Sequence, residues 1–186
     1  RWARLDNDIF NKYLSKTYAI EFPCVRVIEN NINNDNNKIK KCIFLGTLYR
    51  GVRDPSYMFE LFDDLLKQNK VIIELVGVNE DILTDEQRKL PIICYGRKDI
   101  EECKTMMNSA DYLINIGNKV DNQVPSKIFE YISTGIPIIN LCQMKNCPTI
   151  EYLKKNENAL SLIKNEEEVN LQKKILETFI NNQHKK

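Results

Sequence analysis

Residues 124–139, VPSKIFEYISTGIPII, predict a short helix set between two strands. Pro125 suits the first position of a helix, because the N–H that proline lacks would be unpaired there in any case. Gly135 and Pro137 end the helix before the apolar run that follows. A short helix that connects two apolar strands is the repeating unit of a parallel sheet, so this stretch indicates the fold class.

The first turn of this helix carries a candidate anion site. Ser126 and Lys127 lie where unpaired backbone N–H groups and the positive end of the helix dipole favour a diphosphate. Glu130 falls on the same face one turn deeper, where its carboxylate can accept hydrogen bonds from a ribose diol. The same spacing also fits a plain ion pair between Lys127 and Glu130 on a solvated face. The spacing alone leaves both interpretations open.

Apolar strands and amphipathic helices alternate regularly after Lys41. The expected strands are Cys42–Leu45, Val71–Val76, Ile92–Tyr95, Tyr112–Ile116, Ile136–Leu141 and Ala159–Ile163. The other expected helices are Ser56–Lys67, Asp81–Lys89, Ile100–Ser109, Thr149–Lys155 and Glu166–Asn181. Because parallel strands need crossover helices, we predict an α/β fold: a Rossmann-like three-layer domain with a six-stranded parallel sheet flanked by helices. Ligands of such sheets bind at the carboxyl ends of the strands, where Gly46, Gly77, Gly96 and Gly117 lie; for Gly77 we favour a structural role.

The N-terminal part of the chain has a different character. Residues 2–15 predict an amphipathic helix, residues 25–28 a short strand, and the asparagine-rich residues 30–37 a linker. We therefore divide the chain at this linker into residues 1–37 and residues 38–186, and expect the second part to form one domain.

Composition narrows the function classes. The 186 residues are 42% hydrophobic and 28% charged, and their net charge is +1. Such a small net charge gives no large positive field that would attract nucleic acid. No apolar run is long enough to span a membrane and no signal peptide opens the chain, so a cytoplasmic location is expected. We interpret the six cysteines as reduced thiols, mostly in the core, and expect no metal site. The one histidine, His184, lies in a polar tail, so chemistry here must use carboxylates, cations and backbone dipoles.

Several segments, in this order, resemble the C-terminal, donor-binding half of GT-B-fold glycosyltransferases of the group 1-like kind, whose best-known members are retaining enzymes. The segments that carry the resemblance are the linker Val25–Asn33, Phe44–Tyr49, Leu75–Gly77, Ile93–Gly96, Ala110–Ile114, and Pro125–Tyr131 with Thr134–Ile138. The resemblance extends from Val25 to about Ile163. It implies one half of a GT-B fold, in which residues 1–37 are a remnant of the N-terminal domain with the interdomain linker and residues 38–186 are the nucleotide-sugar-binding, Rossmann-like domain.

The resemblance also implies roles for individual residues. Arg50 and Arg53, in the loop after the first strand, would hold the donor diphosphate, and Lys127 would meet the charge that develops on the leaving diphosphate. Arg50 and Lys127 are thus the expected catalytic residues. The expected donor-binding residues are Gly46, Tyr49, Arg53, Gly96, Arg97, Asn122, Val124, Ser126 and Glu130. Asn122 stands where many relatives carry a Glu that approaches the sugar, so the sugar itself is not predicted.

The function implied is transfer of a sugar from a nucleotide-diphosphate sugar to a glycan or lipid-linked acceptor in polysaccharide biosynthesis. The acceptor would bind a missing N-terminal domain, so this chain should bind the donor without efficient transfer. No cofactor or metal is expected, and the resemblance allows peripheral membrane association of the full enzyme. A sugar-nucleotide epimerase half and a non-catalytic nucleotide-binding or scaffold module are the alternatives. A dinucleotide oxidoreductase is disfavoured, because the loop 46–51 lacks the Gly-x-Gly-x-x-Gly pattern.

Overall fold

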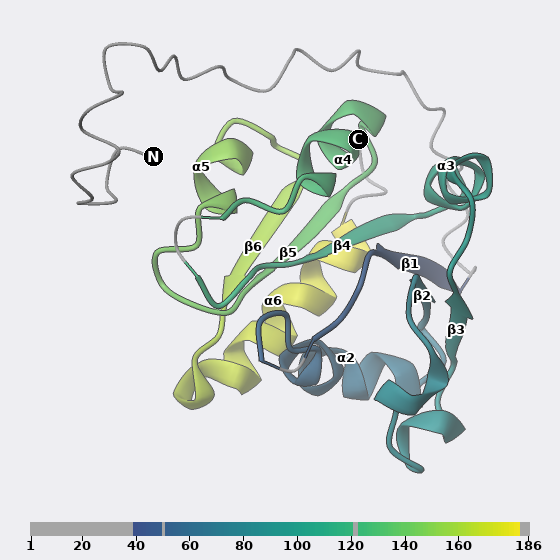
Figure 1. Ribbon diagram of the computed structural model, residues 1–186. Coiled ribbons are helices and arrows are strands. Elements are labelled where there is room, and N and C mark those ends of the chain that lie inside the picture. Colours follow the sequence, from purple (N-terminus) through teal and green to yellow (C-terminus); the bar gives the residue numbers. More distant parts are fainter. Residues whose placement is uncertain (1–38, 50, 121–122, 183–186) are drawn as a thin grey trace.

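The computed structural model describes residues 39–49, 51–120 and 123–182 of the chain, and these residues form one α/β domain (Figure 1). The predicted helix at residues 2–15 and the strand at 25–28 lie outside the described residues. The strands are β1 (Lys40–Leu45), β2 (Val71–Val76), β3 (Ile92–Gly96), β4 (Tyr112–Ile116), β5 (Ile138–Cys142) and β6 (Ala159–Ile163).

The described strands form one six-stranded sheet in the order β3-β2-β1-β4-β5-β6, and each neighbouring pair is parallel. This arrangement confirms the predicted fold class. The chain builds β1, β2 and β3 outward in one direction, then returns to the other side of β1 for β4, β5 and β6. The direction of winding therefore reverses between β1 and β4.

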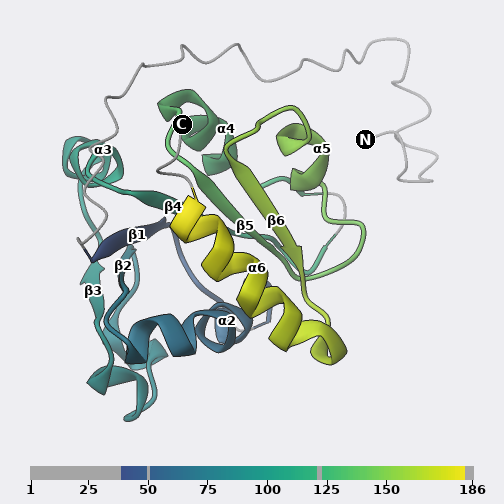
Figure 2. The same ribbon diagram turned by 180° about the vertical axis from the view of Figure 1, so that it is seen from behind.

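Helices cover both faces of the sheet (Figures 1 and 2). The helices α2 (Ser56–Lys67) and α6 (Val169–Asn182) lie on one face. The opposite face carries α3 (Ile100–Asn108), α4 (Lys127–Thr134) and α5 (Thr149–Leu153). The model therefore has the three layers that the alternating pattern predicted. Within the described residues, no helix combines the length and the apolar character that a membrane crossing requires.

Each face of the sheet has its own hydrophobic core. Phe62 of α2 and Leu176 of α6 are fully buried in the first core, with every second side chain of the central strands. Ile128 of α4 is fully buried in the second core, beside Leu113 and Ile138 from the strands. Since successive side chains of a strand point to opposite faces, a sheet covered on both sides needs apolar residues at nearly every central position. This explains why β1, β4 and β5 are mostly apolar along their buried lengths.

The segment between β2 and β3 differs from the prediction. In place of a single helix over Asp81–Lys89 the model has two short 3₁₀ turns, η3 (Glu80–Ile82) and η4 (Gln87–Lys89). The side chains of Thr84 and Gln87 bond reciprocally to each other's backbone N–H groups, at 3.0 and 3.3 Å, and so start a new turn. These local bonds compete with a continuous helix. The final helix likewise opens with a 3₁₀ turn, η5 (Glu166–Glu168), before α6 begins at Val169.

Gly77 has a structural reason to be glycine. Its φ angle is +88°, and a Cβ atom placed on it would lie 2.8 Å from the carbonyl oxygen of Gly46. The loops after β1 and β2 therefore pack backbone against backbone at the carboxyl edge of the sheet, which only a residue without a side chain allows.

We predict that Gly77→Ala lowers the free energy of unfolding by about 1–3 kcal/mol, from backbone strain and displacement of the Gly46 carbonyl. Gly51→Ala is the matched control, because a Cβ atom there meets nothing within 4 Å. Urea denaturation of both variants measures the difference. Equal unfolding midpoints for the two variants would show that the loops after β1 and β2 can move apart without a loss of stability.

Candidate functional site

The carboxyl ends of β1 and β4 separate at the point where the winding reverses. The two strands pair only from Cys42 to Phe44 on β1. Beyond that, the N–H of Gly46 donates to Val76 of β2 at 2.9 Å, and the N–H of Gly117 donates to Leu141 of β5 at 2.8 Å. Each strand end thus follows its outer neighbour. The crevice between them is the position at which open α/β sheets bind ligands.

The side chain of Tyr131, from α4, fills the inner part of this crevice. Its hydroxyl accepts a hydrogen bond from the backbone N–H of Leu45 at 2.9 Å, and the ring is fully buried. Burial raises the pKa of Tyr131, so the phenol stays protonated at neutral pH. The hydroxyl thereby supplies the partner that β4 no longer offers to the end of β1, and it fixes α4 relative to the loop that starts at Gly46.

The start of α4 differs from the prediction by two residues. The prediction placed Pro125 at the first helical position, with the N-cap before it. In the structure Ser126 is the N-cap, and the helix begins at Lys127. The first backbone bonds run from Ile128 to Pro125 and from Phe129 to Ser126, a tighter i to i−3 turn than an α-helix has. Glu130 consequently lies in the first turn, not one turn deeper. Gly135 ends the helix as predicted, at φ +70°.

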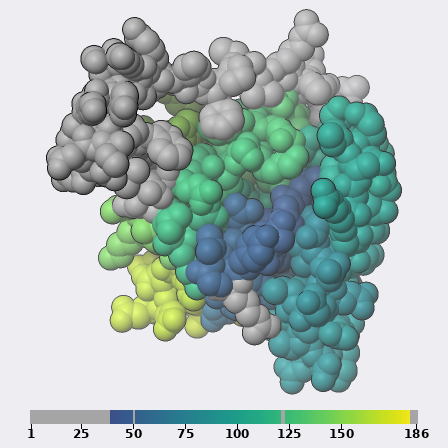
Figure 3. Space-filling model, viewed as in Figure 1, coloured from purple at the N-terminus to yellow at the C-terminus, as the bar shows by residue number. Residues whose placement is uncertain are grey.

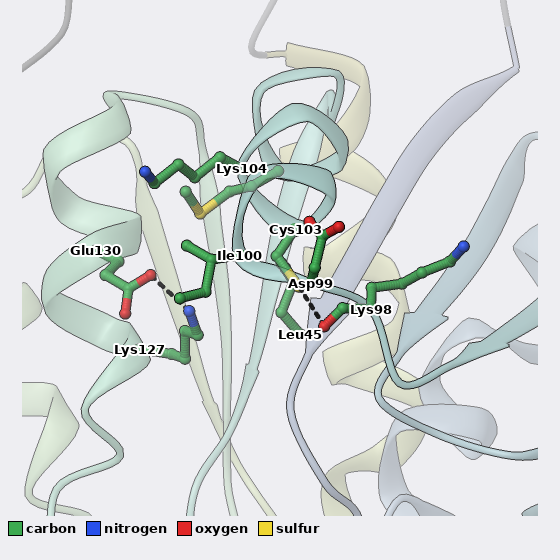
Figure 4. A pocket seen from close by; sticks show the side chains of 9 residues that line it. Leu45, Lys98, Asp99, Ile100, Cys103, Lys104, Lys127 and Glu130 are labelled. Carbon is green, nitrogen blue, oxygen red and sulfur yellow. Dashed lines mark hydrogen bonds and ion pairs between the residues drawn. The ribbon is translucent and has the colours of Figure 1, made fainter.

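A cavity of about 110 Å³ lies between α3, α4 and the end of β1 (Figure 4). In Figure 3 the loop after β1, in blue, is flanked by the α4 segment in green and the α3 segment in teal. The lining residues are Leu45, Lys98, Asp99, Ile100, Cys103, Lys104, Met107, Lys127 and Glu130.

Lys127 and Glu130 both face this cavity and also pair with each other. Their Nζ and Oε2 atoms are 2.6 Å apart, and each side chain is partly exposed. Figure 4 shows the pair on α4 with Ile100 and Lys104 of α3 across from it. The ion pair and the cavity lining, which the spacing offered as alternatives, are therefore present together. A ligand that binds the Lys127 or the Glu130 side chain must therefore break the ion pair between them.

The cation Lys104 lies under the influence of two carboxylates. It donates to Glu101 Oε1 at 2.7 Å, and its pKa is raised first by that bond and further by the charges of Glu101 and Glu130. Lys98 pairs in the same way with Glu102 at 2.9 Å, which raises the pKa of Lys98. The rim of the cavity therefore carries cations that are already balanced by acidic neighbours.

The beginning of α3 is held in place by its own residues. Asp99 Oδ1 accepts from the N–H of Glu102 at 2.8 Å, and Glu102 Oε2 accepts from the N–H of Asp99 at 3.1 Å, which is a complete capping box. This places Lys98 and Ile100 beside the cavity. The sequence analysis identified neither as a site residue, although the Asp99-x-x-Glu102 pattern is a visible helix-start signal.

Arg53 lies at the same crevice, on the β1 side. Its Nε and Nη2 atoms donate to Asn118 Oδ1 at 3.2 and 3.0 Å, and Nη1 lies near Gly46, 3.4 Å from the position of a Cβ atom there. Tyr49 is joined to Arg53 by backbone hydrogen bonds that close a tight loop. Asn118, buried directly after β4, is a residue that the sequence analysis did not single out. The fold thus brings Gly46, Tyr49 and Arg53 together.

The other expected site residues lie elsewhere or outside the described residues. Gly96 shapes the end of β3, where its carbonyl accepts from Gly77 at 2.6 Å, and the side chain of Arg97 is exposed; neither lines the cavity. Val124 packs against the second core. Arg50 and Asn122 lie outside the described residues.

Comparison with solved structures places this fold among known ones. The crystal structure of TarM, a glycosyltransferase, aligns with a TM-score of 0.58 at 13% sequence identity. The alignment covers 85% of this chain and 31% of the TarM chain, so the chain spans about a third of that protein. No protein-family model and no curated protein matches the sequence. The likeness shows that this domain shares an α/β fold with part of TarM.

We predict that Tyr131→Phe lowers the free energy of unfolding by about 1–3 kcal/mol, because the buried N–H of Leu45 loses its partner. Tyr152→Phe is the control, since Tyr152 is half exposed and keeps its ring contact with Phe129 as phenylalanine. Thermal and urea unfolding test this, and hydrogen exchange at Leu45 gives a local readout. Unchanged protection of that amide in Tyr131→Phe would contradict the role of the hydroxyl.

Proposed function

We propose that this domain binds a nucleotide-diphosphate sugar, as the donor half of a glycosyltransferase. One observation carries the proposal: Lys127 and Glu130, at the start of α4, line a cavity beside the end of β1, next to the point where the sheet reverses its winding. A cation at a helix start suits a diphosphate, and a carboxylate three residues later suits a ribose diol. The GT-B-like fold is consistent with this assignment.

In this proposal the nucleoside enters between α3 and α4. Ribose lies in the cavity, and its two hydroxyls donate to Glu130, which lines it. Because Glu130 then exchanges its bond to Lys127 for bonds to ribose, the Lys127 ammonium is released to the diphosphate. Donor binding and the positioning of this cation are thereby coupled. The base extends toward the loop between β3 and α3, where Lys98 and the first residue of α3, Ile100, line the cavity.

Arg53 supplies the second positive charge in this proposal. Its guanidinium is planar and can hold two diphosphate oxygens at once, as it now holds the oxygen of Asn118 with two nitrogens. Partial burial lowers the pKa of Arg53 from its usual value, yet guanidinium remains charged at neutral pH. Lys127, Arg53 and the N–H groups at the start of α4 then share the charge that develops on the leaving diphosphate.

The remaining parts of the reaction belong to the proposal as well. The acceptor is a glycan or a lipid-linked sugar held by a second domain, and the full enzyme works at the cytoplasmic side, with peripheral contact to a membrane. The chain spans 31% of the TarM chain, which leaves room for such a domain in proteins of that architecture. On this view the chain alone binds the donor and transfers little.

We predict that Lys127→Ala and Glu130→Ala each weaken binding of the preferred nucleoside diphosphate by about 1–3 kcal/mol, because each leaves a charged or hydroxyl partner unmet. Isothermal titration of the whole chain with UDP, GDP, ADP and NAD in parallel measures this and names the base. The matched controls are Glu151→Ala and Lys154→Ala, which remove an equivalent i, i+3 pair at 2.6 Å on α5, away from the cavity. Equal affinity in all four variants would refute the site, and preference for NAD would favour an oxidoreductase.

We also predict that Arg53→Lys weakens diphosphate binding by roughly tenfold, because an ammonium cannot make two parallel hydrogen bonds. The control is Arg53→Gln, which keeps hydrogen-bonding groups but removes the charge and should weaken binding further. Titration with the nucleoside and with its diphosphate separates the effects: only the diphosphate should respond. If the nucleoside loses affinity equally, Arg53 acts through the structure of its loop and not through phosphate.

A further inference from the structure

Two cysteines flank the loop between β5 and α5. Cys142 is the last residue of β5, and Cys147 lies two residues before α5 begins at Thr149. Both are free thiols, with side chains 0% and 4% exposed. A Cβ atom placed on Gly117 would lie 3.0 Å from Cys147 Sγ and 3.6 Å from Cys142 Cα. The loop therefore folds back so that the sulfur of Cys147 lies close to Cys142.

The two sulfurs share a polar environment inside the second face of the sheet. Cys147 Sγ is 3.0 Å from Thr149 Oγ1, which donates to Asn140 Oδ1 at 2.9 Å. Asn140 Nδ2 in turn lies 3.3 Å from Cys142 Sγ. Neighbouring strands extend this network: Asn115 donates to Asn140 at 2.7 Å, and Asn140 donates to Ser161 at 2.9 Å. Structural cysteines in a core are usually surrounded by apolar atoms, so this environment is unusual for inert thiols.

The network makes the two thiols chemically different. Hydrogen bonding from the Cys142 thiol lowers the pKa of Cys147, and the Thr149 hydroxyl and the N–H groups of Thr149 and Ile150 lower it further. The neighbouring Cys147, together with burial, raises the pKa of Cys142. A cysteine with a lowered pKa beside a second, protonated cysteine is the arrangement of a nucleophilic cysteine with its resolving partner.

We propose that Cys147 and Cys142 form a peroxide-reactive dithiol that closes to a reversible disulfide. The Cys147 thiolate attacks one oxygen of hydrogen peroxide, the O–O bond breaks, and the products are a sulfenic acid and hydroxide. Cys142 sulfur then attacks Cys147 sulfur, the S–S bond forms, and the hydroxyl group leaves. The two protons of the dithiol end in water, so two thiols and one peroxide give one disulfide and two waters.

Selectivity and access follow from the surroundings of each cysteine. Hydrogen peroxide is nearly as small as water, and in this proposal it enters beside the exposed residues Lys145 and Asn146, which lie between the two cysteines in the loop. Burial raises the pKa of Cys42 and Cys94, so these thiols stay protonated and slow. The half-buried Cys103 packs against the second core, and its thiol makes a long hydrogen bond of 3.9 Å to the carbonyl of Lys98. Cys147 is thus the described cysteine best prepared to react.

The two cysteines are also connected, through Gln143, to the crevice at the end of β1. Gln143 follows Cys142 directly, and its Nε2 atom donates to the carbonyl of Asp54 at 2.7 Å, next to Arg53. A disulfide that pulls Cys142 and Cys147 together therefore acts on the loop that carries Arg53. The proposed dithiol does not depend on the proposed donor binding, because its chemistry involves only the two cysteines and peroxide.

Trypsin makes the test direct, since Lys145 separates the two cysteines. The whole chain is treated with hydrogen peroxide at neutral pH, alkylated and digested. We expect peptides Ile128–Lys145 and Asn146–Lys154 to appear as one species, about 2 Da lighter than their sum and split by dithiothreitol. The rate should be at least about tenfold above that of Cys103 and should fall as the pH is lowered, because only the thiolate attacks peroxide.

Variants separate the two roles. Cys142→Ser should leave Cys147 as a sulfenic acid that dimedone traps, whereas Cys147→Ser should leave Cys142 unreacted. Cys103→Ser is the control and should keep the linked peptides. Separate, fully alkylated peptides after peroxide treatment would overturn the proposal, and so would linkage to other cysteines at a comparable rate. A dimedone adduct on Cys103 ahead of Cys147 would likewise assign the reactivity elsewhere.

Discussion

The hydrogen bond from the backbone of Leu45 to the hydroxyl of Tyr131 connects the two halves of this domain at their weakest point. A parallel sheet that reverses its winding must let two central strands part, and each parted strand exposes backbone groups on its inner side. Here the partner comes from the helix that carries Lys127 and Glu130. The same contact that completes the end of β1 therefore sets the distance between the candidate charged groups and the loop with Arg53.

The sequence predicted the parts of the fold that depend on local pattern. Glycines and prolines marked the ends of β1 and α4, and apolar periodicity separated strand from helix for every strand of the sheet. The sequence did not predict where side-chain hydrogen bonds would replace helical ones. The reciprocal bonds between Thr84 and Gln87 divide one expected helix into two turns. The start of α4 moved for a similar reason, because a tight turn at Pro125 precedes the helix.

The candidate site was less accessible to sequence reasoning, because its contacts join residues far apart in the chain. Tyr131 meets Leu45 across 86 positions, and Arg53 meets Asn118 across 65. A lone tyrosine on an apolar helix face is interpreted as a core residue, and Tyr131 is indeed in the core. The sequence pattern therefore does not show that its hydroxyl also makes a hydrogen bond. Lys127 and Glu130 could be identified from the sequence, because residues three positions apart on a helix lie close together. Lys104 joins them only because α3 lies beside α4 in the fold, which the sequence does not show.

The capping box of α3 has a consequence for how this domain can change. Asp99 and Glu102 fix the helix start by bonds to each other and need nothing from the rest of the molecule. The residues before and after Asp99 are therefore held in position by an autonomous clamp and contribute little to the core. Mutations at Lys98 or Ile100 can accumulate at small cost in stability, so the rim of the cavity can diverge among descendants, or be redesigned in the laboratory, while the sheet beneath it stays the same.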